Sequence, residues 1–182
     1  AQFVAGTNPE VRALPDEETR ALADLVTRRR QIIQMIVAEK QREKRAPQRT
    51  RKSIVRLLKA LEKELSSLDQ DIDDAVRGSP VWREKEDLMS TVPGVGTVIS
   101  RTILAELPEI GTLDRRQIAA LVGLAPFTRQ SGQWRGQSFI AGGRTSVRSA
   151  VFMGALAATR YNPQIRDFHQ RLIAAGKPKM VA

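Results

Sequence analysis

Residues 53–76 read SIVRLLKALEKELSSLDQDIDDAV, and this stretch decides the fold class. Its apolar residues recur in alternating steps of four and three, at Ile54, Leu58, Leu61, Leu65, Leu68, Ile72 and Ala75. The spacing is a heptad seam about three repeats long, which is typical of a coiled coil. The seam can pair with the preceding helix as an antiparallel hairpin, with another subunit, or with both. We expect the coiled coil to form a homodimer.

The segment before the seam also has a helical pattern. Pro15 followed by three acids is typical of a helix start, because acids favour the positive end of the helix dipole. Apolar spacing predicts a helix to about Arg45. Pro47 then breaks it, and residues 48–52 are expected to form a basic connection. Residues 14–79 are therefore predicted to be a basic coiled-coil arm, and residues 1–13 an irregular start or truncated end.

Charge is divided unevenly along the chain, although the net value is +10. Residues 28–59 hold twelve Lys/Arg and two acids, and residues 115–182 hold eleven and one. Residues 60–114 hold five Lys/Arg and twelve acids. Two basic blocks around an acidic one favour a polyanionic partner over a merely solubilising surface. Arg49, Arg51 and Lys52 in the expected connection are candidate nucleic-acid contacts.

The composition narrows the fold class and the kinds of site. Hydrophobic residues make up 41% of the chain but aromatic residues only 4%, which suits packed helices, so we predict a mainly α fold. Without cysteine there is neither a disulfide nor a thiolate metal site. No apolar run has the length of a membrane span or the form of a signal peptide, so we expect a cytoplasmic protein and no membrane partner.

A second domain is predicted at residues 80–182, after the break at Gly78-Ser79-Pro80. The segment from Val81 to Leu107 reads as helix, turn, helix, and its turn resembles a helix-hairpin-helix motif. In that motif, backbone N–H groups at the start of the second helix face a DNA phosphate. The candidate phosphate contacts are Gly94, Gly96 and Thr97. A tight turn between two core-packed helices explains the same residues equally well.

Further helices are predicted beyond that motif. Asp114 is expected to cap a helix from Arg115 to about Val122. Residues 142–146 are expected to cap a helix from about Val147 to Tyr161, and Pro163 to start a last one. The middle helix has small residues that allow close packing, namely Ala150, Val151, Gly154, Ala155 and Ala158. Arg144 and Arg148 lie near its N-terminal end and form a second candidate phosphate site.

The candidate nucleophile is Ser131, in the polar loop of residues 125–136. Arg129 and Arg135 flank it, and Gly132 follows it, so backbone can come close to a ligand. A hydroxyl between two permanent cations suits a phosphodiester. On spacing alone, a plain surface turn is the commoner explanation. Residues 132–140 are expected to form a short β-hairpin or an irregular loop.

Other candidate groups have simpler explanations. Ser146 is interpreted as a helix cap and Ser138 as a hairpin residue. His169 is interpreted as a surface residue rather than a base. Trp134 could stack on a nucleic-acid base, but a lone aromatic residue near a loop more often packs against protein.

Several short motifs occur in a fixed order: LMSTVPGVG at 88–96, IAALVGLAP at 118–126, RQSG at 129–132, GRTSVR at 143–148, YNP at 161–163 and GKPKMVA at 176–182. Together they resemble the C-terminal transposase domain of the insertion-sequence one-ten family. These DEDD-type recombinases include the pilin-gene inverting recombinases. The likeness covers about residues 81–182, and the preceding helices occupy the place of the family's coiled-coil linker.

The resemblance implies a DNA transposase or site-specific recombinase, in which Ser131 attacks a phosphodiester and forms a phosphoserine link. Family members hold Mg²⁺ with four acids of an N-terminal RuvC-like domain. We expect those ligands to lie outside this chain, so that the fragment alone is inactive and contains no metal ligands.

The resemblance also implies partners. DNA is the substrate, several family members use a guide RNA, and dimers and tetramers assemble. The expected location is a prokaryotic cytoplasm, at the nucleoid during action. The alternative is a non-catalytic, dimeric helical module that binds DNA or RNA, with Ser131 as a turn residue.

Overall fold

A computed structural model describes residues 15–179, and the expected irregular start at residues 1–13 lies outside them. The described part is mainly helical, as predicted. Its helices are α2 (Glu17–Arg45), α3 (Gln48–Gly78), α4 (Pro80–Ser90), α5 (Thr97–Glu106), α6 (Arg115–Val122), α7 (Thr145–Tyr161) and α8 (Pro163–Ala174). Its strands are β1 (Pro126–Phe127), β2 (Gln130–Ser131), β3 (Trp134–Arg135) and β4 (Phe139–Ile140). None of the helices in this part is long and apolar enough to cross a membrane.

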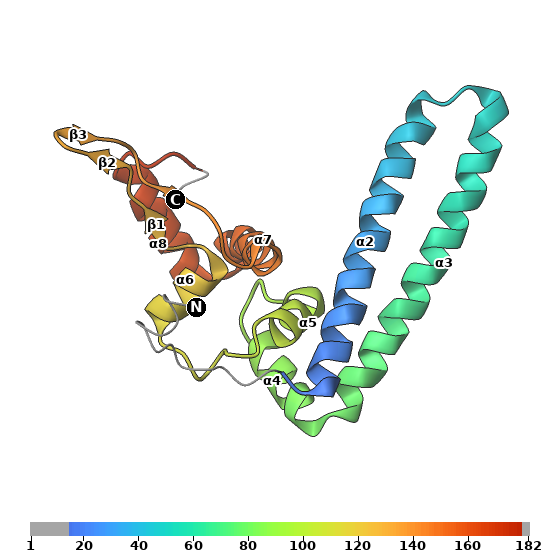
Figure 1. The fold of residues 1–182 in the computed structure, drawn as a ribbon, viewed down its shortest axis with the longest axis horizontal. Coiled ribbons are helices and arrows are strands. Elements are labelled where there is room, and N and C mark those ends of the chain that lie inside the picture. Colours follow the sequence, from blue (N-terminus) through green and yellow to red (C-terminus); the bar gives the residue numbers. More distant parts are fainter. Residues whose placement is uncertain (1–14, 180–182) are drawn as a thin grey trace, which may run out of the picture.

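Helices α2 and α3 form a long antiparallel hairpin, which we call the arm (Figure 1). The heptad seam faces α2: Leu58 and Leu68 are buried against Ile32 and Ile36, and the other seam residues are partly or fully buried beside them. Pairing with the preceding helix is thus confirmed. Homodimer formation through the arm stays a prediction.

The basic connection predicted at residues 48–52 is wrong, because these residues form the first turns of α3. Only Ala46 and Pro47 separate the two helices. Pro47 has φ −59° and precedes the first helical residue, a place where its missing N–H costs nothing. The glutamine, arginines and lysine that follow are good helix formers, so nothing delays the helix.

The base of the arm shares a core with the rest of the molecule. Leu22 and Val26 of α2 and Ile72 and Val76 of α3 pack with Leu104 and Ala105 of α5. This apolar cluster spans residues on both sides of the Gly78-Ser79-Pro80 break. The division into an arm and a second domain at residue 80 stays a prediction, and the two parts meet through a buried interface.

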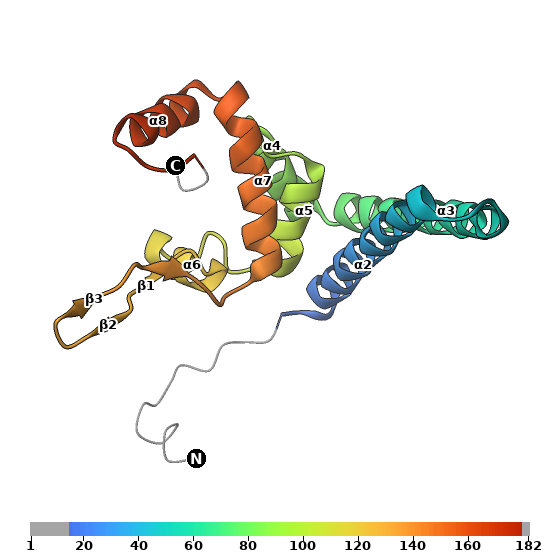
Figure 2. The same cartoon turned by 90° about the horizontal axis from the view of Figure 1, so that it is seen from above.

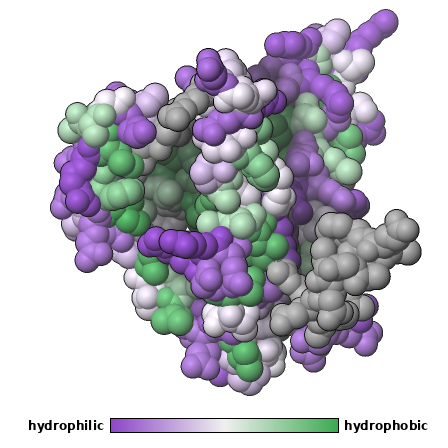
Figure 3. Space-filling view, turned by 60° about the vertical axis from the view of Figure 1, so that its left-hand side comes forward, coloured by the Kyte–Doolittle hydropathy of each residue, from purple (hydrophilic) through white to green (hydrophobic). Residues whose placement is uncertain are grey.

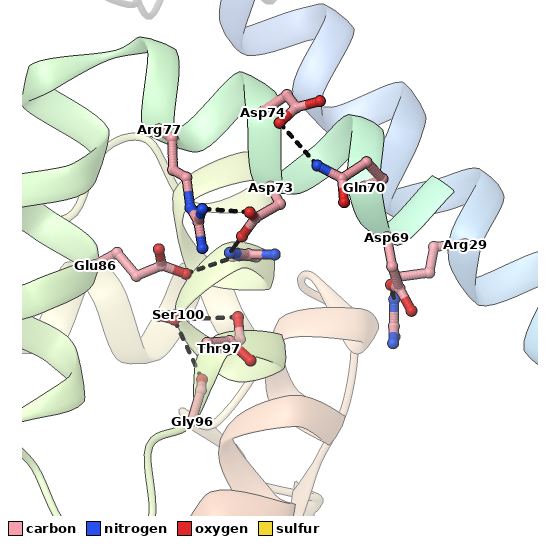
Figure 4. Close-up of polar contacts among 11 residues, drawn as sticks. Arg29, Asp69, Gln70, Asp73, Asp74, Arg77, Glu86, Gly96, Thr97 and Ser100 are labelled. Carbon is pink, nitrogen blue, oxygen red and sulfur yellow. Dashed lines mark hydrogen bonds and ion pairs between the residues drawn. The ribbon is translucent and has the colours of Figure 1, made fainter. Parts of the chain in front are cut away.

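Ion pairs surround that interface. Arg101 of α5 donates to Asp73 of α3 at 2.6 Å and to Glu86 of α4 at 2.8 Å, and Figure 4 shows both carboxylates reaching one guanidinium. Burial alone would lower the pKa of Arg101, but the hydrogen bonds to Glu86 and Asp73 raise it on balance. Arg30 of α2 pairs with Glu106 of α5 at 2.8 Å. These pairs fix α5 against α2, α3 and α4.

The turn between α4 and α5 packs directly on α7. Gly94 has φ +104°, and a Cβ there would lie 2.7 Å from the Gly154 carbonyl oxygen and 2.9 Å from the Ala158 nitrogen. Gly154 and Ala158 are buried. The prediction that small residues of this helix allow close approach is confirmed.

The C-terminal elements continue from this block. Asp114 caps α6 with a capping box, and Gly123 ends α6 at φ +82°, as the predicted boundaries require. Strand β1 pairs with β4 and β2 with β3, so residues 126–140 form a β-hairpin that projects away from the helices (Figure 2). The arm projects in the opposite direction in both ribbon views.

Candidate nucleic-acid site

The β-hairpin of residues 126–140 presents the candidate nucleophile. Ser131 pairs with Trp134 across a tight turn, where Gly132 has φ +57°. Positive φ suits glycine, which explains its place directly after the serine. Of the two expectations for residues 132–140, a short hairpin or an irregular loop, a hairpin is observed, but it begins at residue 126, and residues 132–140 form its turn and its returning strands.

Ser131 is exposed at the end of this hairpin. Burial of its hydroxyl in the core would have excluded attack on DNA, and the fold places it outside the core. Figure 3 shows groups of apolar residues separated by hydrophilic ones on one face of the molecule. The serine is therefore accessible to a large substrate, and its catalytic role stays a prediction.

Of the two arginines beside the serine, the structure describes the side chain of Arg129 but not that of Arg135. The Arg129 guanidinium lies 4.8 Å from the centre of the Phe139 ring, a cation–π distance. Phe139 in turn packs on Phe127, with ring centres 6.2 Å apart. Arg129 is exposed and has no ion pair within residues 15–179, so its charge remains available. The side chain of Arg135 lies outside what the structure describes.

Arg144 has a carboxylate partner. It donates to both carboxylate oxygens of Glu109, at 2.5 and 2.6 Å, and to the carbonyl of Glu106 at 2.8 Å. The hydrogen bonds to Glu109 raise the pKa of Arg144 above its ordinary value, although burial opposes them. The pair neutralises the charge and fixes the start of α7 to the end of α5. Phosphate binding by Arg144 stays a prediction, and it would have to displace Glu109.

Arg148 supports the backbone of the loop before α7. One of its nitrogens donates to the carbonyls of Val122, Gly123 and Gly142, at 3.1, 3.3 and 2.6 Å. These bonds join the end of α6 to the segment between β4 and α7. A phosphate contact by Arg148 is also untested, and the observed role is structural.

The interpretation of Ser146 as a helix cap is wrong. Helix α7 begins at Thr145, its N-cap residue is Arg144, and no side chain caps it. Ser146 lies one residue inside the helix and donates to the carboxylate of Glu106. The acid lies 40 residues earlier in the chain, so local sequence could not indicate this contact.

The helix-hairpin-helix residues divide into two groups. Gly94 is required by its contact with α7, which fits the packing explanation. Gly96 and Thr97 are exposed at the N-terminal end of α5, and a Cβ at Gly96 would meet nothing within 4 Å. A phosphate contact at this open helix end stays a prediction.

The basic residues of the arm lie far from the serine. Arg49, Arg51 and Lys52 are exposed in the first turns of α3, at the tip of the arm. Arg51 donates to the Glu43 carbonyl at 3.3 Å, which ties the two helix ends together. The ribbon views place this tip and the β-hairpin at opposite ends of the molecule (Figures 1 and 2). The structure therefore offers two separate cationic regions rather than one.

The described residues do not suit the magnesium that the resemblance implies. Across residues 15–179 no group of three or more histidines and acids is placed to hold a metal ion. His169 is half-buried on α8, so its interpretation as a surface residue is only partly right.

Sequence comparison gives two findings. Residues 86–170 match the profile described as "Transposase IS116/IS110/IS902 family". The chain is also 27% identical over 128 residues to the "Insertion element IS110 uncharacterized 43.6 kDa protein" of Streptomyces coelicolor. That alignment covers 69% of this chain and 30% of the relative, so the chain spans about a third of the relative's length. By both findings the chain is similar to insertion-element proteins of the IS110/IS116 type, and the profile match lies in its C-terminal part.

Proposed function

We propose that this chain is part of a DNA transposase in which Ser131 attacks a DNA phosphodiester and becomes linked to the cut strand. The observation that carries the proposal is the exposed serine at the end of a projecting hairpin, inside the stretch that matches the transposase profile. The exposed position leaves the hydroxyl free for a substrate.

The chemistry follows from the groups on the hairpin. The seryl oxygen forms a bond to phosphorus, a bridging P–O bond breaks, and the proton lost by serine ends on the freed sugar hydroxyl. Negative charge grows on the non-bridging oxygens as the bond forms. Arg129, two residues before the serine and exposed, supplies a cation to stabilise that charge.

Residues 15–179 contain no group of three or more acids and histidines placed to hold a metal ion, so they do not supply the magnesium site for these steps. The metal-binding acids that the resemblance implies would have to come from other protein residues. We therefore propose that the described chain binds DNA by itself and does not cut it.

The test is a covalent-adduct assay with the complete protein, magnesium and labelled DNA. Ser131→Ala should abolish the denaturation-resistant protein–DNA adduct while leaving DNA binding within about twofold, since a hydroxyl contributes little to affinity for a polyanion. Ser138→Ala is the matched control, because Ser138 is exposed in the same hairpin and should keep the adduct. An adduct formed by Ser131→Ala protein would refute the assignment.

The alternative is a non-catalytic nucleic-acid binder, and the exposed cations at the tip of the arm favour it specifically. It predicts no adduct from the unsubstituted protein under any condition. Removing three of these cations together, with Arg49, Arg51 and Lys52 changed to Gln, should then weaken binding and lower its salt dependence. If the partner is RNA, RNA should bind more tightly than DNA in the same salt titration.

A further inference from the structure

We propose that Trp134 is a stacking platform for an unpaired base, so that the hairpin prefers single-stranded or locally opened DNA to closed duplex. This inference rests on the proposed function, because it takes Ser131 as the group that attacks the phosphate next to the opened base. The binding preference itself needs no cleavage and can be measured separately.

The first observation is the register of the hairpin. Ser131 and Trp134 are direct partners in the β2–β3 pair. Directly opposed residues of an antiparallel pair have Cβ atoms about 5 Å apart, and their side chains leave the same face. A nucleotide whose phosphate meets Ser131 therefore lies on the face of the hairpin that carries the Trp134 side chain.

The second observation is how the indole is held. A Cβ at Gly136 would lie 2.3 Å from Cη2 and 2.7 Å from Cζ3 of Trp134, so the ring covers this glycine. Trp134 nevertheless remains 60% exposed. The expectation that a lone aromatic residue packs is thus met on the Gly136 side only. Much of the ring is left for a ligand.

The third observation is the chemistry around the ring. Phe127 and Phe139 are also exposed, at 53% and 41%, and Arg129 lies over Phe139. Residues 115–182 carry eleven Lys/Arg and one acid. Exposed aromatic rings among cations are the combination that binds single-stranded nucleic acid, in which bases stack and arginines follow the phosphates. An apolar protein partner would not need the excess of positive charge.

The experiment uses indole fluorescence in the full chain. Trp82→Phe leaves Trp134 as the one tryptophan, because the chain has two. This protein is titrated at one salt concentration with oligothymidine and with the duplex that oligothymidine forms with oligoadenine. We expect strong quenching by the single strand and little by the duplex, since only an unpaired base can stack on the ring.

Affinity gives the second readout. Trp134→Ala should weaken oligothymidine binding about fivefold to a hundredfold, the range for the loss of one stacked base. Trp134→Phe should keep most of the affinity, and duplex binding should change less than threefold in both variants. Unchanged circular dichroism and melting temperature would show that Trp134→Ala still folds.

Two results would overturn the inference. If Trp134→Ala weakened binding of single strand and duplex equally, the ring would make a contact that does not depend on an unpaired base. If it weakened neither, the ring would make no contact with DNA. Ser131→Ala separates the two proposals: it should keep the quenching, whether or not it abolishes the adduct. Loss of the adduct in Ser131→Ala, with unaltered single-strand binding in Trp134→Ala, would refute stacking and leave the proposed function standing.

Discussion

The arm and the β-hairpin both project from the central helices, but different forces hold them. The arm is closed by two buried apolar clusters along its length, and its base is fixed by ion pairs to α5. The hairpin has two pairs of two-residue strands, and its large side chains are mostly exposed. The arm is therefore held by a buried core that it shares with α5, whereas the hairpin leaves its large side chains exposed to a ligand.

Because of this difference, we expect the arm to determine stability and the hairpin to determine binding or chemistry. Changes in the arm should lower the free energy of unfolding of the whole chain, because its core is continuous with that of α5. Changes in the hairpin should leave global stability nearly intact and alter binding or chemistry. Four substitutions test this contrast, from the largest expected effect to the smallest.

Ile72→Ala should have the largest effect. Ile72 is 1% exposed in the cluster at the base of the arm, so the shorter side chain leaves a cavity. Loss of a buried isoleucine typically costs about 2–5 kcal/mol of unfolding free energy. Urea denaturation followed by circular dichroism measures it. Leu57→Ala, on the same helix but 46% exposed, is the control and should cost less than about 1 kcal/mol. Similar costs for both would mean that the base of the arm is not a core.

Arg101→Met should come next. The methionine keeps much of the volume but removes the partner of Asp73 and Glu86 in a mostly buried place. Removing this partner from Glu86, and leaving Asp73 with Arg77, should cost about 1–3 kcal/mol. Arg77→Met is the matched control, because Arg77 also pairs with Asp73 but its side chain is 72% exposed. Its cost should stay below about 1 kcal/mol. A thermal melt of the two variants decides whether α5 is fixed by this network.

Gly132→Val should affect the hairpin alone. Valine at φ +57° is strained by about 1–2 kcal/mol, and opening the hairpin relieves this strain more easily than unfolding the helices does. We expect faster exchange of the Gly136 amide hydrogen, which bonds to the Arg129 carbonyl at 2.9 Å, and an unchanged melting temperature. Gly132→Asn is the control, since asparagine tolerates positive φ. A fall in melting temperature equal to that of Ile72→Ala would contradict the independence of the two regions.

Asp16→Ala should have the smallest effect and a characteristic pH dependence. Asp16 accepts from the Thr19 amide at 2.6 Å, and this hydrogen bond lowers the pKa of the carboxyl. A lowered folded-state pKa stabilises the protein above the ordinary carboxyl pKa, and this contribution is lost as the pH falls through the folded value. The difference in melting temperature between Asp16→Ala and the parent should therefore be present at neutral pH and vanish in acid. Asp16→Asn keeps a cap that does not titrate, so its melting temperature relative to the parent should rise as the pH falls through the folded pKa of Asp16.

The sequence predicted best what depends on near neighbours. Heptad spacing located the arm, Asp114 the start of α6, and the small residues of α7 its close contact with the Gly94 turn. All of these patterns repeat within one helix or one turn. A short hairpin was one of two expectations for residues 132–140, and local spacing neither decided between them nor placed Ser131 on one of its strands.

The sequence predicted least where partners are distant in the chain. Arg144 was assigned to phosphate because it stands at a helix start, but its Glu109 partner is 35 residues away. Ser146 was assigned to a cap for the same reason, whereas it bonds to Glu106. Both acids were counted only as part of an acidic block. Their contacts arise when α7 packs on α5, a step that periodicity does not encode.

Glu106 receives contacts from three directions: Arg30 of the arm, Ser146 of α7 and, at its carbonyl, Arg144 at the start of α7. Glu106 thus joins the arm, formed by α2 and α3, to the segment that follows the hairpin. Loss of its carboxylate would therefore loosen the arm and α7 from α5 at the same time.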